Sequence, residues 1–81
     1  MAGLIEIKEY PSDADTFLHS FATAHIRENV FTANLPVQGW GYLIVIKQAY
    51  DQYLQVFYTA TGRKHYIRSS REGAWCSWVE L

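Results

Sequence analysis

The sequence is short of cysteine, of long apolar runs and of excess charge, and each shortage excludes a class of protein. One cysteine among 81 residues allows no internal disulfide and gives no sign of an oxidising compartment. No stretch approaches the ~18 consecutive apolar residues of a membrane-spanning helix, so membrane insertion is not expected. A net charge of -1 does not steer the chain toward nucleic acid. The N-terminus lacks the basic and then apolar pattern of a signal peptide, so we expect synthesis in a cytoplasm.

Aromatic residues are what the sequence has in excess. Three Trp, six Tyr and four Phe make up 16% of the chain. A chain of this length buries only roughly 60–65% of its unfolded surface, so it needs a disulfide, a metal, association or a very apolar core. So many rings cannot all be buried. Some are expected to line a binding surface or a subunit interface, where Tyr and Trp are favoured.

The apolar pattern predicts an α+β fold, in which one short helix packs on a small antiparallel β-sheet, a meander of about four to six strands. Residues 1–12 are interpreted as an N-terminal arm or stalk end, and residues 13–81 as the knob-like domain. The helix is predicted over residues 13–23, with Ser12 or Asp13 as its N-cap, because apolar residues recur there at helical spacing. Those residues are Phe17, Leu18, Phe21 and Ala24.

Alternation of side chains predicts the strands, and the strongest strand covers residues 41–48. Both faces of this strand are largely apolar, which is typical of a central strand covered on two sides. One face carries Tyr42, Ile44 and Ile46, and the other Leu43, Val45 and Lys47. The other predicted extended segments are 25–33, 53–59, 64–70 and 75–81, with a loop at 34–39 and turns at 49–52, 60–63 and 70–73.

Residues able to do chemistry are few and scattered. His19, His25 and His65 lie far apart and make no zinc-binding pair, and one cysteine cannot make a thiolate cluster, so we expect no metal and no cofactor. Cys76 could act as a nucleophile with His65 as its base, if the two lie on neighbouring strands. A small buried apolar residue is the other interpretation of Cys76. We expect a protein that is not an enzyme, with a small hydrolase as the alternative.

Residues 39–45, GWGYLIV, superficially resemble the aromatic RNA-stacking strand of the RRM fold. Gln38 stands where that motif has a leading Lys or Arg. The chain also lacks the two-helix order of that fold, and its net charge is not basic. No nucleic-acid partner is therefore expected.

A set of aromatic and basic residues in the C-terminal half is the strongest candidate for a binding site. Flat rings stack on the apolar faces of sugars, and a few polar groups fix the orientation of a ligand between aromatic walls. The same residues would also serve core packing or a subunit interface. The candidate ligand-binding residues are Tyr58, Tyr66, Arg68, Trp75 and Trp78.

Four segments of the chain occur in a particular order and spacing. They are a glycine-led apolar strand at 39–45, Gln-Val-Phe-Tyr at 55–58, Tyr-Ile-Arg at 66–68 and Gly-Ala-Trp-Cys-Ser-Trp at 73–78. Together they resemble the pyocin-knob type module, which occurs near the ends of phage tail fibres, tail spikes and related contractile-tail particles. The likeness spans about residues 13–81. It departs from the family at 22–27, where a Pro-Gly-x-Tyr turn is frequent, and at Cys76, where Thr or Ser is common.

The resemblance implies a virion component without enzymatic activity, assembled as a homotrimer. Such a component forms or supports the receptor-binding tip, which contacts a host cell-surface polysaccharide or other receptor. Its further partners would be other domains of a longer fibre, and its place would be the virion tail after synthesis in the host cytoplasm. Trimerisation would bury apolar surface that so small a monomer cannot bury alone. A free-standing carbohydrate-binding or adaptor domain outside any virion is the alternative.

Overall fold

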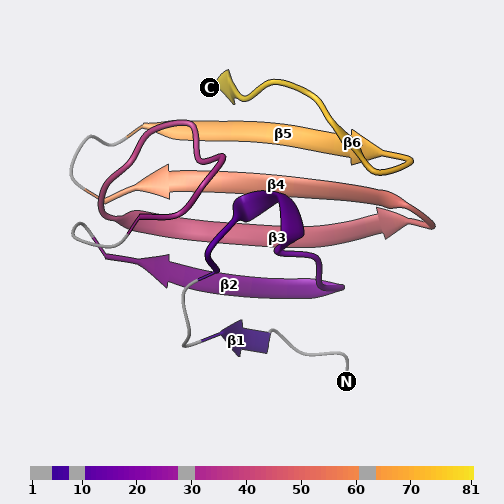
Figure 1. The fold of residues 1–81 in the computed structure, drawn as a ribbon, viewed down its shortest axis with the longest axis horizontal. Helices are drawn as coiled ribbons and strands as arrows, with labels where there is room; N and C mark the ends of the chain where they lie inside the picture. Colours follow the sequence, from indigo (N-terminus) through magenta and orange to yellow (C-terminus); the bar gives the residue numbers. More distant parts are fainter. Residues whose placement is uncertain (1–4, 8–10, 28–30, 61–63) are drawn as a thin grey trace.

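The strands join into a single sheet in the computed structural model, which describes residues 5–7, 11–27, 31–60 and 64–81 (Figure 1). The strands are β1 (Ile5–Ile7), β2 (Phe21–Ile26), β3 (Gly41–Ala49), β4 (Gln52–Thr59), β5 (His65–Arg71), β6 (Ala74–Trp75) and β7 (Val79–Glu80). Neighbours follow the order β1-β2-β3-β4-β5-β6, and β7 also pairs with β5. β1 runs parallel to β2, and the pairs that join β2 through β7 are antiparallel. From β2 to β6, chain order and sheet order therefore agree, as in a meander.

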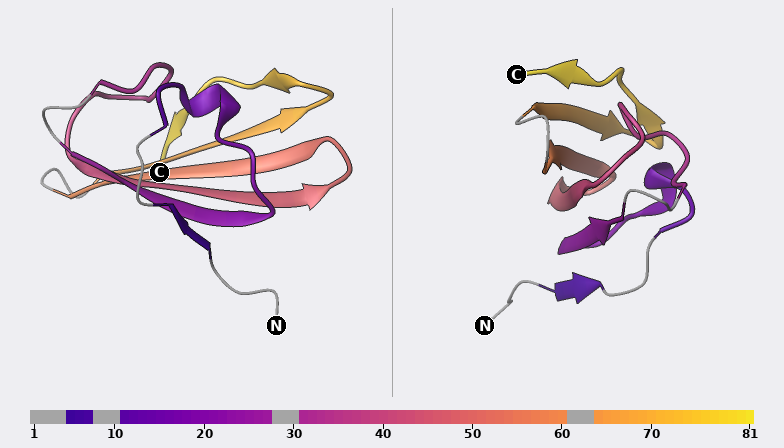
Figure 2. Two further views of the ribbon diagram at one scale, coloured as in Figure 1. Left: turned by 60° about the horizontal axis from the view of Figure 1, so that its bottom comes forward. Right: turned by 90° about the vertical axis from the view of Figure 1, so that its left-hand side faces the viewer.

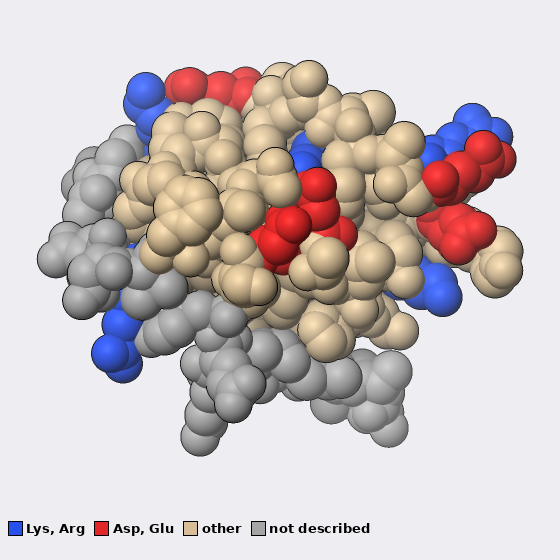
Figure 3. Space-filling view, viewed as in Figure 1, with Lys and Arg blue, Asp and Glu red and all other residues tan. Residues whose placement is uncertain are grey.

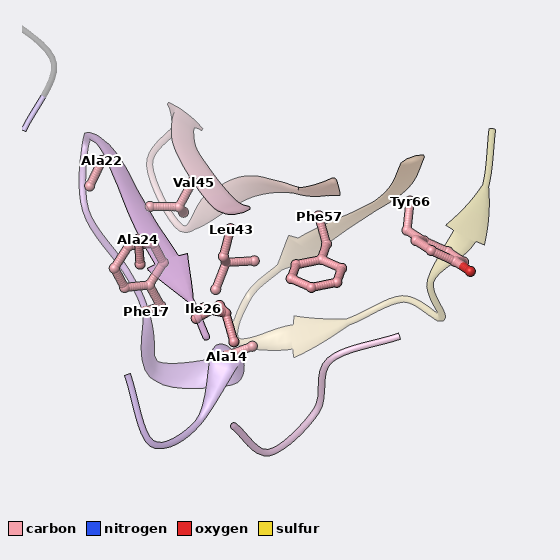
Figure 4. Packing of buried hydrophobic residues seen from close by; sticks show 9 residues of the cluster. All are labelled: Ala14, Phe17, Ala22, Ala24, Ile26, Leu43, Val45, Phe57 and Tyr66. Atoms are coloured by element: carbon pink, nitrogen blue, oxygen red, sulfur yellow. The ribbon is translucent and has the colours of Figure 1, made fainter. Parts of the chain in front are cut away.

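One face of the sheet, here termed the inner face, carries the core. Leu43 pairs with Ala24 on one side and with Phe57 on the other, so these side chains point the same way. Figure 4 shows them packed together with residues from outside the sheet. The buried apolar residues are Ala14, Phe17, Ala22, Ala24, Ile26, Leu43, Val45, Phe57 and Tyr66.

Two irregular segments, 11–20 and 31–40, lie across the inner face. Figures 1 and 2 show them on the same side of the sheet. The first contains a single 3-10 turn, η1 (Ala14–Thr16), which begins at Asp13, whose side chain accepts a hydrogen bond from the Asp15 backbone N–H at 2.9 Å. Backbone hydrogen bonds of 2.9 Å from Ala14 to Ala33 and from Ala33 to Ser12 join the two segments. We name these two segments the cover; backbone hydrogen bonds between them hold the cover together.

The predicted helix over residues 13–23 is wrong, and so is the α+β fold class. The described chain is a mostly antiparallel β-sheet with one 3-10 turn, and its described residues include no α-helix. The helical spacing of Phe17, Phe21 and Ala24 misled the prediction, because residues 21–26 alternate between exposed and buried positions as a strand does. Ala22 and Ala24 are small enough to lie beneath the cover, so packing overrides alanine's helix propensity.

The predicted strands after residue 40 are largely confirmed. β3, β4 and β5 match the predictions to one residue at each end, but the predicted closing strand is divided into β6 and β7. The extended segment predicted from residue 25 begins at Phe21 instead. Residues 28–30 of that segment, 61–63 of a predicted turn, and 1–4 and 8–10 of the predicted arm lie outside the described residues.

The opposite face, here termed the outer face, also carries apolar side chains. On β3 it presents Tyr42, Ile44 and Ile46, as the alternation predicts. The apolar residues on both faces of β3 also predict a second layer of structure on this side. Among the described residues the irregular segments all lie over the inner face, so the outer face has no second layer (Figure 2).

Candidate functional site

A shallow hollow of about 350 Å3 opens where the end of the chain meets the cover of the inner face. We name it the tryptophan hollow. Its lining residues are Asp15, Asn34, Leu35, Arg68, Trp75, Cys76, Ser77 and Trp78. Figure 3 looks onto this side of the molecule, where acidic surface lies beside a small basic patch near the centre. Aromatic walls and polar groups of both charges therefore meet at one place.

Arg68 forms the floor of the hollow. Its guanidinium carbon lies 4.1 Å from the ring centroid of Trp75 and 4.5 Å from that of Trp78, within the range of a cation–π contact. Nη1 of Arg68 lies 2.9 Å from Oδ1 of Asp15, and its side chain is only 5% exposed. The two indole rings are thus held against a cation that is itself fixed in place.

The charge of Arg68 is balanced locally. Burial lowers the pKa of Arg68 below its ordinary value, and the hydrogen bond and charge of Asp15 oppose this shift. Arginine remains protonated at any physiological pH, because its ordinary pKa lies so far above neutrality. The floor is therefore an ion pair of Arg68 and Asp15, and the formal charges of the lining residues cancel.

Both indoles are also fixed by their N–H groups. Trp75 Nε1 donates to the backbone oxygen of Asp15 at 3.3 Å, and Trp78 Nε1 donates to that of Asn34 at 2.8 Å. Asn34 is itself held, because its side chain donates to Asp13 at 2.8 Å. The rings are thereby tied to both covering segments, and their orientation is set before any ligand arrives.

Three of the five predicted site residues come together in the hollow: Arg68, Trp75 and Trp78. Tyr66 is buried in the core and lines a separate hollow of about 240 Å3 beside Trp40. Tyr58 lies on the outer face, where its ring stacks on His65 at 4.6 Å between centroids. Strand alternation places Tyr58 and Tyr66 on opposite faces, since Tyr66 pairs with Phe57 and not with Tyr58.

Sequence reasoning missed the polar residues of the hollow, Asp15, Asn34 and Ser77, and their support, Gln55. Asp15 and Asn34 arrive from segments far from Trp75 in sequence, so no local pattern signals their meeting. Gln55 did leave a signal, because it interrupts an apolar strand at an inward position. A fully buried glutamine there requires partners for its amide group.

The alternative catalytic pair is distributed over two sides of the sheet. His65 stacks on Tyr58 on the outer face, whereas the exposed Cys76 lines the tryptophan hollow. Within residues 5–7, 11–27, 31–60 and 64–81, no group of three or more His, Cys, Asp and Glu side chains could hold a metal ion. In the same part of the chain no helix is long and apolar enough to cross a membrane.

Comparisons with known proteins found no similar protein. No protein-family model matches the chain, and neither a curated protein nor a solved structure is significantly similar to it.

Proposed function

We propose that this chain is a binding module without enzymatic activity, and that it contacts a cell-surface glycan through the tryptophan hollow. The observation that carries the proposal is the pair of indole rings, Trp75 and Trp78, fixed over one buried guanidinium. Sugar sites combine flat aromatic walls with a few polar groups that select hydroxyl positions. The hollow combines both features where the sheet meets its covering segments.

The lining residues divide into two roles. The indole rings of Trp75 and Trp78 line the hollow and offer apolar area to a sugar ring. The partly exposed Asp15 carboxylate can accept hydrogen bonds from hydroxyls. The exposed Asn34 and Ser77 supply further polar groups at the rim. Arg68 is a positioning residue, because its buried guanidinium is already engaged with Gln55 and Asp15.

The setting we propose is the receptor-binding tip of a phage tail fibre or tail spike. The order of motifs from residue 39 to residue 78, which resembles the pyocin-knob type module, supports this setting. In it the chain would assemble as a homotrimer with other domains of a longer fibre and would reside in the virion tail. The alternative is a free-standing carbohydrate-binding or adaptor domain. A long parent reading frame with triple-stranded fibrous repeats favours the fibre, and a frame without them favours the alternative.

A glycan array, followed by calorimetric titration of the best oligosaccharide, tests the binding site. Trp78→Ala should weaken binding about 10-fold or more, since a desolvated aromatic anchor typically contributes 1–3 kcal/mol. Trp78→Phe retains an aromatic ring, so it should lose less binding affinity than Trp78→Ala. Tyr50→Ala is the matched control, because Tyr50 is 85% exposed and lies outside the hollow.

Circular dichroism of each variant separates lost binding from lost folding. Equal weakening by Tyr50→Ala and Trp78→Ala would place the site elsewhere. The absence of any bound glycan on the array would reject the proposed ligand class.

A further inference from the structure

The outer face of the sheet is a continuous apolar surface across β2, β3, β4 and β5. Register places its side chains in three rows, each containing one residue from every strand. The first row is Phe21, Ile46, Leu54 and Ser69, the second is Thr23, Ile44, Val56 and Ile67, and the third is His25, Tyr42, Tyr58 and His65. We name these three rows the open face.

The open face is exposed in spite of its composition. Phe21 is 41% exposed, Tyr42 42% and Ile46 36%, and the three rows contain no Asp, Glu, Lys or Arg. Soluble monomers rarely leave a contiguous apolar patch of more than a few hundred Å2 in water, and such patches mark interaction surfaces. A charged partner would gain nothing specific here, so the occupant must itself be apolar.

The third row is not a sugar platform. His25 stacks on Tyr42 at 4.9 Å and 16°, and Tyr58 stacks on His65 at 4.6 Å and 24°. These distances match the spacing of adjacent strands, so the two rings of each pair turn their faces toward one another. The two tyrosine rings in the middle of the row are tilted by 47° at 6.4 Å between centroids. Trp40 continues the row, because its Nε1 donates to Nε2 of His25. Ring edges are what this row presents to a partner, and ring edges pack against apolar side chains.

The size of the open face fits a contact between proteins. Four strands ~4.8 Å apart and roughly six residues of ~3.3 Å each give a flat area of about 400 Å2. The relief of the side chains enlarges this area, and the exposed Val79, which pairs with Ile67, extends it along β7. The flat area alone is thus about half of the ~800 Å2 per partner of a stable protein interface, and the side-chain relief and Val79 bring the surface closer to that size.

We propose that the open face is covered by another copy of this chain. The rows carry no formal charge when both histidines are neutral, so two copies meet there without repulsion, and apolar rows of one sheet can pack on those of the next. Sheets packed face to face lie ~10 Å apart, and the second sheet supplies the layer that the pattern of β3 predicts. Two sheets face to face or three around an axis would both close the assembly. The tryptophan hollow lies on the inner side, so this inference does not depend on the proposed glycan binding.

Light scattering coupled to size exclusion at about 100 μM tests the inference on the wild-type chain. We expect a molar mass of two or three chains of 9.4 kDa. Val56→Lys places a charge in the middle row and should yield a folded chain of 9.4 kDa. Val37→Lys is the matched control, since Val37 is 39% exposed in the loop on the other side and should leave the mass unchanged.

A wild-type mass of one chain, or an assembly that Val56→Lys leaves intact, would overturn the proposal. Because Val56→Lys could fail to fold, Ile67→Thr provides a milder second test: threonine favours strands, and the change replaces an apolar ethyl group by a hydroxyl. Its apparent dissociation constant for self-association should rise by at least about 10-fold. No rise in a folded Ile67→Thr would equally count against the open face as the contact.

Discussion

Gln55 and Arg68 are direct partners across β4 and β5, and one amide oxygen joins them: Oε1 of Gln55 accepts from Nε and Nη2 of Arg68 at 3.0 and 2.7 Å. The amide nitrogen of Gln55 donates in the other direction, to the backbone oxygens of Ala14 and Phe17 at 2.7 and 3.2 Å. One buried side chain therefore links the η1 segment to the floor of the tryptophan hollow. Loss of either partner leaves buried polar groups without hydrogen bonds, which costs more than the bonds themselves contribute.

Gln55→Leu should lower the free energy of unfolding by about 3 kcal/mol, because both backbone oxygens and the Arg68 guanidinium lose buried partners. Urea unfolding followed by circular dichroism measures this change. Gln48→Leu is the matched control, since Gln48 is exposed on β3, and it should change stability by no more than about 0.5 kcal/mol. Equal effects in the two variants would show that Gln55 does not anchor the cover.

Arg68→Lys should destabilise the chain by about 1–3 kcal/mol although it keeps the charge. Lysine has no planar group to lie against Trp75 and Trp78 and cannot donate two hydrogen bonds to one amide oxygen from a fixed fork. The indole rings should become more exposed, so tryptophan emission should shift to longer wavelength. Arg71→Lys, on the same strand at an exposed position, should leave the emission and the unfolding midpoint unchanged.

The central strands could be predicted because their signal is local. In β3, β4 and β5 the side chains alternate and glycines or polar residues bound the strands, so register and faces follow from the sequence. β2 could not be recognised in the same way. Its alternation depends on Ala22 and Ala24, which fit under Phe17 only once the cover has folded over the sheet. The helical spacing of the apolar residues was a coincidence, because long-range packing makes this segment a strand.

The candidate site could be predicted only in part, for a related reason. The pairing of Trp75 and Trp78 with Arg68 follows from their closeness in sequence and the turn after β5. Asp15 and Asn34 join them because the covering segments are tied to each other and to Gln55, and no sequence pattern encodes such contacts. Tyr58 was assigned to the site by residue type, although its alternation with Phe57 already indicated the other face.

Gly41→Ala should destabilise the chain by about 1–3 kcal/mol through overpacking. A Cβ at this position would collide with the backbone oxygen of Tyr58 and would lie 2.8 Å from Cζ of Phe57, so the first pair of β3 with β4 must open. Thermal unfolding measures the loss. Gly73→Asn is the matched control: a Cβ there meets no atom within 4 Å, and asparagine tolerates the positive φ of 81°. Equal destabilisation by both variants would contradict the steric argument.

Asp13 should make stability depend on pH in the acid range. Its hydrogen bond from Asn34, followed by that from the Asp15 backbone, lowers the pKa of Asp13 below the ordinary 3.8. A folded-state pKa below the unfolded value means that ionised Asp13 stabilises the fold above pH 3.8, and that this stabilisation disappears as pH falls through the folded value. Asp13→Asn keeps an acceptor but cannot ionise, so the gap in unfolding free energy between wild type and variant should be present at neutral pH and shrink in acid. Asp51→Asn, in an exposed turn with a positive φ that asparagine accepts, is the control, and a gap for Asp13→Asn that is independent of pH would contradict the prediction.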